Sequence, residues 1–459
     1  MLLLALITAW LCVAAWVYLL LGHGGFWRIA SAEMVPTPSQ PRGMSEVPTP
    51  AIAIVIPARN EADVIGRAIA SLLRQSGCDV RIFVVDDNSS DGTGEAARSA
   101  ASFKSVSVPP LRQAQGELLS ASVAGELKPS DRVSVIRGAP LPPGWTGKLW
   151  AMQQGIEQAL RLKPDFLLLT DADIEHAPGS IATLVNIADS GGYDLVSFMV
   201  KLHCRSLAEK LLIPAFVFFF FLLYPPEWVR DPRHRTAGAA GGCMLIRPAA
   251  LERIAGIAAI RHEIIDDCAL ARAVKRSGGR VWLGLESNSG FEARKVKDSI
   301  ASSLAMSEEH VSGHDFSRAE QARNKNSSGL QPATPETRSL RPYESFAEIE
   351  RMIARTAFNQ LHHSSWLLLG TVLGMLLLYV LPLALIVSGS PGPAFAGAFA
   401  YGLMTFAYLP MVRYHRVNPL WALSLPIAGV FYTAATIDSA VKYWTGRGGE
   451  WKGRAQDVG

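Results

Sequence analysis

Long stretches without charge lie near both ends of the chain and limit the folds open to it. Leu2 to Leu21 contains no charged residue. Three stretches toward the C-terminus share this property: Trp366 to Val387, Ala394 to Val412 and Pro419 to Ile437. Each is long enough to cross the ~30 Å hydrocarbon core of a bilayer as a helix. We therefore predict an N-terminal transmembrane anchor, residues 1–22, and a C-terminal transmembrane region, residues 364–445.

A cleaved secretory signal is the alternative at the N-terminus, because Ala30-Ser31-Ala32 resembles a small-residue cleavage site. However, the chain starts without basic residues, and its apolar stretch exceeds the ~7 to 15 residues of a usual signal core. These features favour a retained anchor.

The polar region between the apolar ends has the pattern of an α/β domain. Ala51 to Pro57 is a continuous apolar run, typical of a buried parallel strand. Apolar residues at helical spacing follow from Val64 to Leu73, and Val80 to Val85 is a second strand. This order predicts a right-handed parallel unit. Further strands are expected at Phe166 to Leu169, Leu195 to Val200 and Val281 to Leu285. We predict a mostly parallel sheet within residues 51–286, with ligands at the carboxyl ends of its strands.

Three segments break this rhythm. Residues 102–130 and 287–337 are rich in small and polar residues and are predicted to be disordered insertions. Leu211 to Tyr224 is apolar but too short for a full span. Its length favours an interfacial or re-entrant helix, with Phe216 and Phe218 to Phe221 on a lipid-facing surface, and a buried core helix is the alternative.

Cysteine usage and charge exclude several classes of function. The cysteines are scattered without a Cys-x-x-Cys pair, which argues against a zinc site or a disulfide framework and fits reduced thiols in the cytoplasm. A net charge of +4 is too weak to indicate a nucleic-acid partner. The basic tail, residues 446–459, would suit an anionic membrane surface, although a solvated tail without lipid contact fits equally well.

Two acidic clusters follow apolar runs and carry the strongest chemical signal. Asp171 and Asp173 come directly after Phe166 to Leu169 and, two residues apart, point to the same side of an extended chain. Paired carboxylates suit Mg²⁺ or Mn²⁺, although Asp-x-Asp is also common in solvated loops and helix caps. His176 is either a further metal ligand or a residue with a local hydrogen bond.

The second cluster, Asp266-Asp267, precedes a helical stripe of apolar residues. Acidic residues at a helix start are favoured by the macrodipole, so helix capping is an alternative to catalysis. Lys148 lies just before another expected helix, where it could meet phosphate. The Walker pattern is missing around Lys148, which argues against ATPase activity.

Taken together, these motifs resemble the family 2 glycosyltransferases of the GT-A type. The resemblance rests on motifs in the family's order: Ile56-Pro57-Ala58-Arg59-Asn60-Glu61, Val85-Asp86-Asp87-Asn88-Ser89-Ser90-Asp91-Gly92-Thr93, Gly147-Lys148-x-x-Ala151-Met152-Gln153-x-Gly155, Asp171-x-Asp173 and Asp266-Asp267. Further segments resemble the hopene-associated branch, linked to hopanoid biosynthesis: Pro142-Pro143-Gly144-Trp145-Thr146-Gly147-Lys148, Ala240-Gly241-Gly242-Cys243-Met244-Leu245, Ile265-Asp266-Asp267-Cys268-Ala269-Leu270-Ala271-Arg272 and Arg338-Ser339-Leu340-Arg341-Pro342-Tyr343.

The resemblance implies a GT-A-like nucleotide-sugar-binding domain and a role for each matching residue. Donor-binding positions would be Pro57, Glu61, Asp87, Lys148 and Asp171, with Asp87 placed to accept from a uracil N–H. Asp171 and Asp173 would hold the metal ion, and Asp267 would be the general base.

The acceptor side departs from the pattern of many relatives, which carry Gln/Arg-x-x-Arg-Trp after the base. The corresponding stretch here supplies Arg355 but no tryptophan. Candidates on this side are Asp266, Arg355 and Trp145, and residues 338–363 are predicted to form an interfacial, acceptor-side helix.

The resemblance implies inverting transfer of a sugar from a nucleotide sugar, UDP-linked by preference, to a hydroxyl of a membrane lipid of the hopanoid or polyprenoid class. A metal-dependent nucleotidyltransferase for sugar or lipid head groups is one alternative. A non-catalytic membrane scaffold of a lipid-synthesis complex is another.

The expected location is the inner membrane, with several spans and the active site facing the cytoplasm. Four full spans would then leave the basic tail outside, against the tendency of Lys and Arg to remain in the cytoplasm. We therefore expect one segment to be re-entrant. The candidate is Pro419 to Ile437, which contains Pro426 and Gly429.

Overall fold

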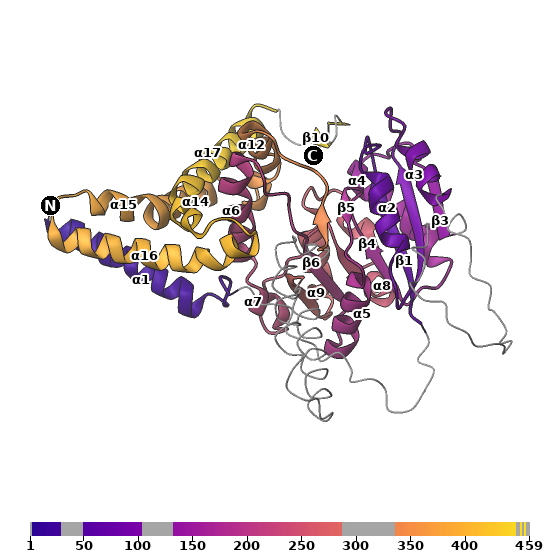
Figure 1. Cartoon of the computed structure of the whole chain (residues 1–459), viewed down its shortest axis with the longest axis horizontal. Coiled ribbons are helices and arrows are strands. Elements are labelled where there is room, and N and C mark those ends of the chain that lie inside the picture. Colours follow the sequence, from indigo (N-terminus) through magenta and orange to yellow (C-terminus); the bar gives the residue numbers. More distant parts are fainter. Residues whose placement is uncertain are drawn as a thin grey trace, which may run out of the picture.

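The computed structural model describes residues 2–28, 49–102, 132–286 and 336–446, together with two short strands, β10 (Glu450–Trp451) and β11 (Arg454–Ala455). These residues form an α/β domain beside a projecting group of apolar helices (Figure 1). The predicted insertions, 102–130 and 287–337, lie outside the described residues except at their ends. Most of the basic tail also lies outside them.

A seven-stranded sheet is the centre of the α/β domain. Its order is β3 (Val133–Arg137), β2 (Asp79–Asp86), β1 (Ala51–Ala58), β4 (Phe166–Leu169), β7 (Met244–Ile246), β6 (Leu195–Met199) and β8 (Val281–Leu285). All neighbouring strands pair in parallel except β7, which is antiparallel to β4 and β6. The predicted mostly parallel α/β sheet is therefore confirmed, and β1 and β2 form the predicted parallel unit around α2 (Ile65–Leu73).

Successive side chains of β1 point to opposite faces of the sheet, and both faces are covered. Ile52, Ile54 and Ile56 pack on one face with α2, α3 (Thr93–Ser102) and α5 (Ser180–Gly191). Ala53 and Val55 pack on the other with α4 (Gly147–Leu160) and α9 (Asp266–Arg276). Burial on both faces explains why β1 is apolar throughout rather than alternating.

Pro57 lies in the part of β1 that extends past the end of its neighbour β4. The N–H of Thr170 donates to Val55 O at 3.2 Å, and β4 ends just before Thr170. Because main-chain groups two residues apart point the same way, a donor at position 57 would face beyond the end of β4. Proline, which has no N–H, is therefore tolerated in this central strand.

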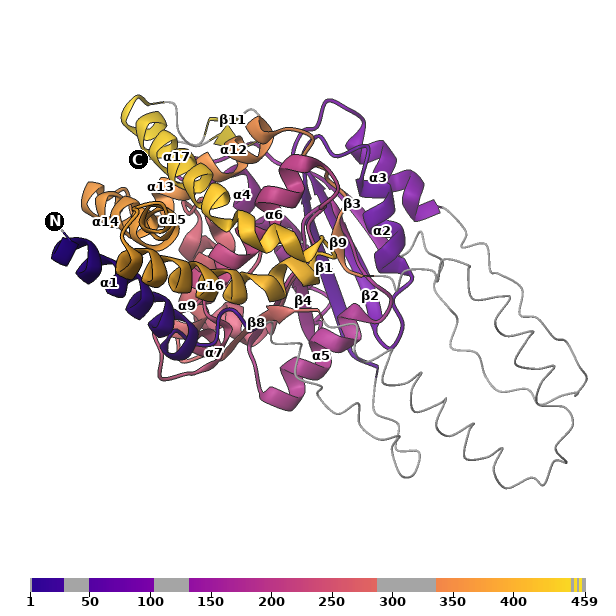
Figure 2. The same ribbon diagram turned by 60° about the vertical axis from the view of Figure 1, so that its left-hand side comes forward.

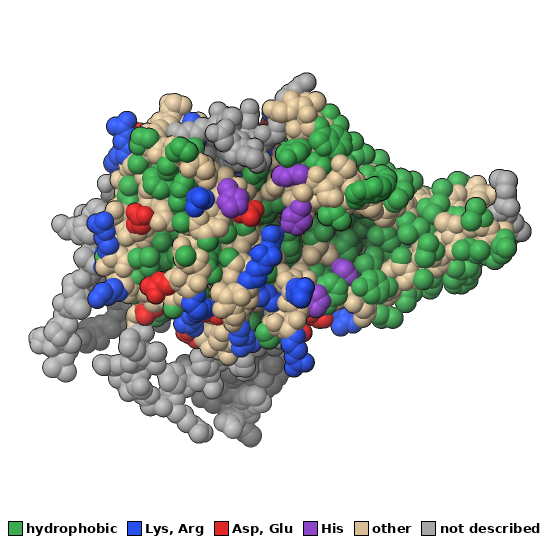
Figure 3. Space-filling model, turned by 180° about the vertical axis from the view of Figure 1, so that it is seen from behind, with side chains coloured by type: hydrophobic (Ala, Val, Ile, Leu, Met, Phe, Trp, Pro, Cys, Tyr) green, Lys and Arg blue, Asp and Glu red, His purple; other side chains and the backbone are tan. Residues whose placement is uncertain are grey.

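Four helical segments are long and apolar enough to cross a membrane. They are Leu3–Gly22 in α1 (Leu2–Gly22), Ser365–Ile386, Pro391–Tyr414 (α16) and Pro419–Trp444, which ends in α17 (Leu425–Trp444). Figure 2 shows α1 and α16 side by side, and hydrophobic side chains cover this projection in Figure 3. The apolar helices predicted at both ends are confirmed by length and composition. That one of them is re-entrant stays a prediction.

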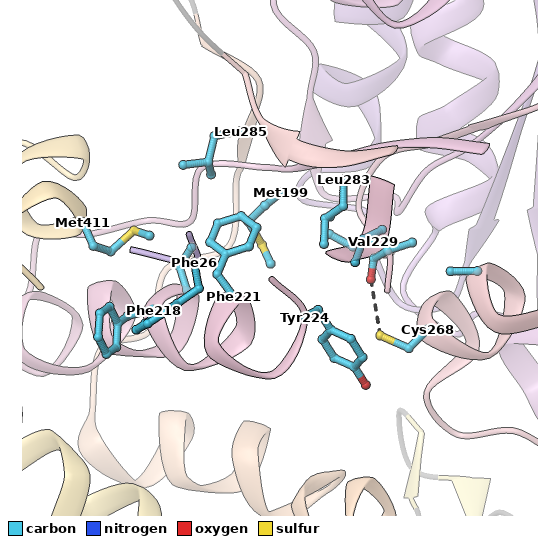
Figure 4. Close-up of a cluster of buried hydrophobic side chains, with 14 of the residues drawn as sticks. Phe26, Met199, Phe218, Phe221, Tyr224, Val229, Cys268, Leu283, Leu285 and Met411 are labelled. Atoms are coloured by element: carbon cyan, nitrogen blue, oxygen red, sulfur yellow. Dashed lines mark hydrogen bonds between the residues drawn. The ribbon is translucent and has the colours of Figure 1, made fainter. Parts of the chain in front are cut away.

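The segment predicted to be an interfacial helix is instead packed in the core. It forms α6 (Leu207–Leu223), in which Phe218 and Phe221 are buried. The Phe218 ring meets the rings of Phe26 and Tyr408, each at 5.2 Å between centroids. Figure 4 shows Phe26, Phe218 and Phe221 in one cluster. The alternative core helix therefore describes the face of α6 that carries Phe218 and Phe221, whereas Phe216, Phe219 and Phe220 are half-buried.

Candidate functional site

The loops that follow β1 and β2 are joined by hydrogen bonds at the carboxyl edge of the sheet. The N–H of Asn60 donates to Ser89 Oγ at 3.0 Å, and the N–H of Ser90 donates to Asn60 Oδ1 at 3.0 Å. Asn60 and Asn88 both adopt φ of 52°, a left-handed conformation that asparagine tolerates better than most residues. The two loops therefore form one wall of the site.

The predicted nucleotide residues lie in this wall. Asp87 is 2% exposed, its N–H donates to Ala58 O at 2.8 Å, and its Oδ2 lies 3.5 Å from Arg59 Nη1. The N–H of Glu61 donates to Thr93 Oγ1 at 2.8 Å. The structure thus brings Asp87 and Glu61 to the end of β1, where Pro57 lies in the strand.

Lys148 joins Asp171-x-Asp173, here called the metal motif after its predicted role, to the second acidic cluster. Its Nζ lies 2.9 Å from Asp171 Oδ1 and 3.1 Å from Asp266 Oδ2. Lys148 stands in the first turn of α4, Asp171 follows β4, and Asp266 begins α9. Burial acts to lower the pKa of Lys148, but the carboxylates of Asp171 and Asp266 outweigh it and raise this pKa above its usual value. The ammonium group therefore remains charged between them.

Asp267 is held by main-chain donors at the start of α9. Its Oδ2 accepts from the N–H of Gly241 at 2.8 Å, and its Oδ1 accepts from the N–H of Cys268 at 2.7 Å. A Cβ at position 241 would lie 3.2 Å from Asp267 Oδ2, so glycine permits this approach. Burial and the negative charge of Asp266 raise the pKa of Asp267 to about 6. A carboxylate with such a pKa is suited to take a proton near neutral pH.

Asp173 is covered by a segment whose role the sequence did not predict. Ser339 Oγ donates to Asp173 Oδ2 at 3.0 Å, and the N–H of Leu340 donates to Asp173 O at 2.7 Å. Arg341 then reaches Glu61, with 2.6 Å between Nη2 and Oε2. The motif Arg338 to Tyr343 was visible in the sequence, but nothing local connected it with Asp173.

Asp171 and Asp173 fit a metal site that a ligand completes. Among the residues that the structure describes, no group of three or more His, Cys, Asp or Glu side chains gathers as a metal site. Mg²⁺ in proteins commonly takes one or two carboxylates and fills its remaining positions with water and substrate phosphates. The two aspartates supply hard oxygen donors of this kind.

His176 is buried and makes a local hydrogen bond. Its Nε2 lies 3.0 Å from Thr170 Oγ1, and that hydroxyl donates to Gly242 O at 2.7 Å. The imidazole N–H must therefore donate to the hydroxyl. Burial lowers the pKa of His176 to about 4, so the ring stays neutral. This geometry favours the local hydrogen bond over metal ligation.

The acceptor-side candidates are dispersed. Asp266 belongs to the Lys148 network, whereas Trp145 is half-buried in the loop before α4, edge-on to Trp150 with 5.2 Å between ring centroids. Arg355 is exposed at the end of α12 (Phe346–Ala354), and its charge opposes the rise in the pKa of Tyr343 that burial causes. Within the described residues, the hydrogen bonds and ion pairs of Lys148 and Asp267 do not include Arg355.

Comparison with known proteins finds a family that is similar to most of the α/β domain. Residues 53–255 match the family described as glycosyl transferase family 2. This stretch, which makes up less than half of the chain, is similar to the family 2 glycosyltransferases. The match spans the sheet from β1 to β7 and includes Asp87, Lys148 and Asp171, whereas Asp267 lies beyond it.

Solved glycosyltransferase structures resemble this domain at low identity. A mannosyltransferase from Pyrobaculum calidifontis in complex with GDP-Man and Mn²⁺ is 16% identical, over 96% of this chain and 99% of that chain, with a TM-score of 0.44. A mannosyl-3-phosphoglycerate synthase from Rubrobacter xylanophilus is 19% identical over 52% and 67%, with a TM-score of 0.31. A glucosyl-3-phosphoglycerate synthase from Mycobacterium tuberculosis is 16% identical over 52% and 71%, also with a TM-score of 0.31.

Proposed function

We propose that this protein is an inverting, membrane-bound glycosyltransferase. It transfers a hexose from a nucleotide sugar, UDP-linked by preference, to a hydroxyl of a membrane lipid of the hopanoid or polyprenoid class. The observation that carries the proposal is Asp267, a carboxylate with raised pKa held beside the Lys148 network in a domain similar to the family 2 glycosyltransferases. A single base of this kind suits direct displacement with inversion, because no covalent sugar intermediate is required.

The donor side of the proposal rests on the residues at the ends of β1, β2 and β4. Asp87 and Glu61 hold the nucleoside end, and Lys148 meets the diphosphate as a point charge. Asp171 and Asp173 would hold Mg²⁺ or Mn²⁺, which would supply charge stabilisation for the departing nucleoside diphosphate. Asp267 removes the proton of the acceptor hydroxyl as its oxygen attacks the anomeric carbon.

A lipid acceptor is supported by the contacts between the base and the apolar helices. Tyr224, whose ring lies near Cys268 in Figure 4, accepts a hydrogen bond from Gln360 of α13 (Ala357–Gln360). The N–H of Phe358, also in α13, donates to Ser439 Oγ of α17 at 3.0 Å. Three contacts, Cys268 with Tyr224, Tyr224 with Gln360 and Phe358 with Ser439, therefore link the residue next to the base to a span-length helix. We place the protein in the inner membrane with this site facing the cytoplasm.

Product analysis of the full-length protein in lipid nanodiscs tests the proposal. With UDP- and GDP-sugars, Mn²⁺ and a hopanoid or polyprenoid alcohol, we expect free nucleoside diphosphate and a glycosylated lipid of inverted anomeric configuration. Chelation should abolish both. Asp267→Asn should be inactive, whereas Asp189→Asn, at an exposed ion pair with Arg247, should retain activity. Pyrophosphate as product would instead indicate a nucleotidyltransferase, and full turnover of Asp267→Asn would exclude the assigned base.

A further inference from the structure

The segment from Glu336 to Tyr343, here called the strap, crosses the metal motif and is fixed at both ends. Its strand β9 (Arg338–Ser339) pairs antiparallel with β5 (Ile174–Glu175), directly after Asp173. Glu336 Oε2 lies 2.7 Å from Lys201 Nζ at one end. At the other end, the N–H of Tyr343 donates to Glu209 Oε1 at 2.7 Å. The main chain of the strap is therefore held without help from the side chain of Arg341.

Arg341 extends from the strap into the gap between two site loops. Its Nη2 lies 2.6 Å from Glu61 Oε2, and its Nε lies 3.7 Å from Asp173 Oδ2. Glu61 follows β1 and Asp173 follows β4, which are neighbouring strands. The guanidinium group thus lies between the metal motif and the wall formed by the loops after β1 and β2, which carries the predicted nucleotide residues. The side chain of Arg341 is 38% exposed. A diphosphate that joins a nucleoside to a metal ion must cross this gap.

The chemistry of the guanidinium group suits that position. It carries five N–H donors in a planar fork, which matches phosphate oxygens in a bidentate geometry. The bond to Asp173 is long at 3.7 Å and engages a carboxylate that a divalent ion also requires. Resting on the proposed function, we propose that Arg341 is a donor-binding residue that transfers from Asp173 to the diphosphate of the nucleotide sugar, leaving Asp173 to the metal ion.

A purely structural role is served by another arginine of the same strap. Arg338 Nη2 lies 2.9 Å from Glu175 Oε2, a carboxylate that Arg67 also contacts, and the ion pairs of Arg338 include none of the aspartates of the acidic motifs among the described residues. Half-exposed ion pairs of this kind contribute about 0–1 kcal/mol to stability. Arg338 is thus a matched control for Arg341, because both extend from the strap and both pair with glutamate.

Calorimetry with the purified full-length protein in detergent tests the assignment. UDP, GDP, UMP and GMP are titrated in the presence of Mn²⁺ into wild type, Arg341→Gln, Arg341→Lys and Arg338→Gln. One of the two diphosphates will bind wild type more tightly. For that diphosphate, we expect the affinity of Arg341→Gln to be about 10- to 100-fold lower than that of wild type, as loss of a charged hydrogen bond predicts. Affinity for the monophosphate should fall less than about threefold. Arg341→Lys should recover part of the loss, and Arg338→Gln should match wild type.

The outcomes separate this assignment from the proposed function. If wild type binds no nucleotide, the proposed function fails and the assignment fails with it. If wild type binds the diphosphate and Arg341→Gln binds it equally well, only the assignment of Arg341 is overturned. Equal losses for monophosphate and diphosphate would also overturn it, because they would mean a general disturbance of the pocket. Thermal unfolding of both glutamine variants establishes that each is folded.

Discussion

Lys148 Nζ lies 2.9 Å from Asp171 Oδ1, and this ion pair joins the start of α4 to the carboxyl end of β4. Asp266 shares the same ammonium group at 3.1 Å. The cation is therefore placed between the metal motif and the helix that carries the expected base. A ligand diphosphate in this position would meet a charge that is already held in place, so binding requires little reorganisation.

Replacement of Lys148 by methionine should reduce sugar transfer strongly while keeping most of the side-chain volume. Loss of one preorganised electrostatic contact typically lowers kcat about 100- to 1000-fold. The measurement is steady-state kinetics in nanodiscs with saturating lipid. Lys163→Met, at an exposed turn after α4, is the control and should retain activity. A tenfold change in kcat corresponds to ~1.4 kcal/mol of activation free energy. A kcat within threefold of wild type for Lys148→Met would therefore be too small a change and would contradict the assigned role.

The rate should depend on the protonation of Asp267. Because a general base must be ionised and the pKa of Asp267 is raised to about 6, kcat/KM should fall as pH drops through that value. Asp266 contributes to the raised pKa, so Asp266→Asn should move the acid limb of the pH profile to lower pH. Lys148 opposes the rise, so any residual activity of Lys148→Met should have its acid limb at higher pH. Shifts in the same direction for both variants would contradict this electrostatic account.

Much of the fold could be predicted because its signals are local. The apolar runs at β1, β2, β4 and β8 match the observed strands closely, since strands buried on both faces are continuous in apolar character. In contrast, β7 was not predicted. It has only three residues, too few for a periodic pattern, and its antiparallel direction is set by the neighbours it pairs with.

The site was predictable in the same uneven way. Asp171 and Asp173 were predicted because they directly follow a strand, whereas the role expected for Asp267 came from the family resemblance, because its place at a helix start also fits a helix cap. The contacts of Arg341 with Glu61 and Asp173 join segments far apart in sequence, and no local pattern encodes such a pairing. The burial of α6 could not be predicted either, because an apolar stretch of this length has the same sequence pattern whether lipid or protein surrounds it.

Glu209 should be important for stability and for the position of the strap. Its buried carboxylate accepts from the N–H groups of Arg205, Ser206 and Tyr343 at 2.7, 2.8 and 2.7 Å. Burial acts to raise the pKa of Glu209, but these hydrogen bonds outweigh it and lower the pKa. The carboxylate thus stabilises the fold above its unfolded pKa, and this contribution is lost as pH falls through the folded value.

Glu209→Gln should therefore lower the free energy of unfolding by about 1–3 kcal/mol at pH 7, because an amide cannot accept all these bonds. The difference from wild type should shrink in acid. Thermal unfolding in detergent at several pH values measures both effects, with the exposed Glu157→Gln as the control. A difference that grows as pH falls would contradict the linkage.

Trp16 should hold α1 within the group of apolar helices. Pro382 has no N–H, so the carbonyl of Leu378, four residues earlier, lacks its helical donor, and Trp16 Nε1 donates to that carbonyl at 3.1 Å. Trp16 is fully buried, whereas Trp10 of the same helix is 50% exposed.

Trp16→Ala should destabilise the protein by about 3–5 kcal/mol and Trp16→Phe by about 1 kcal/mol. Trp10→Ala should stay within about 0.5 kcal/mol of wild type. Thermal unfolding in detergent, with the intact mass of the purified chain, measures both stability and retention of α1. Equal effects at the two tryptophans, or a mass that lacks the first residues, would mean that α1 is not a stable part of the bundle.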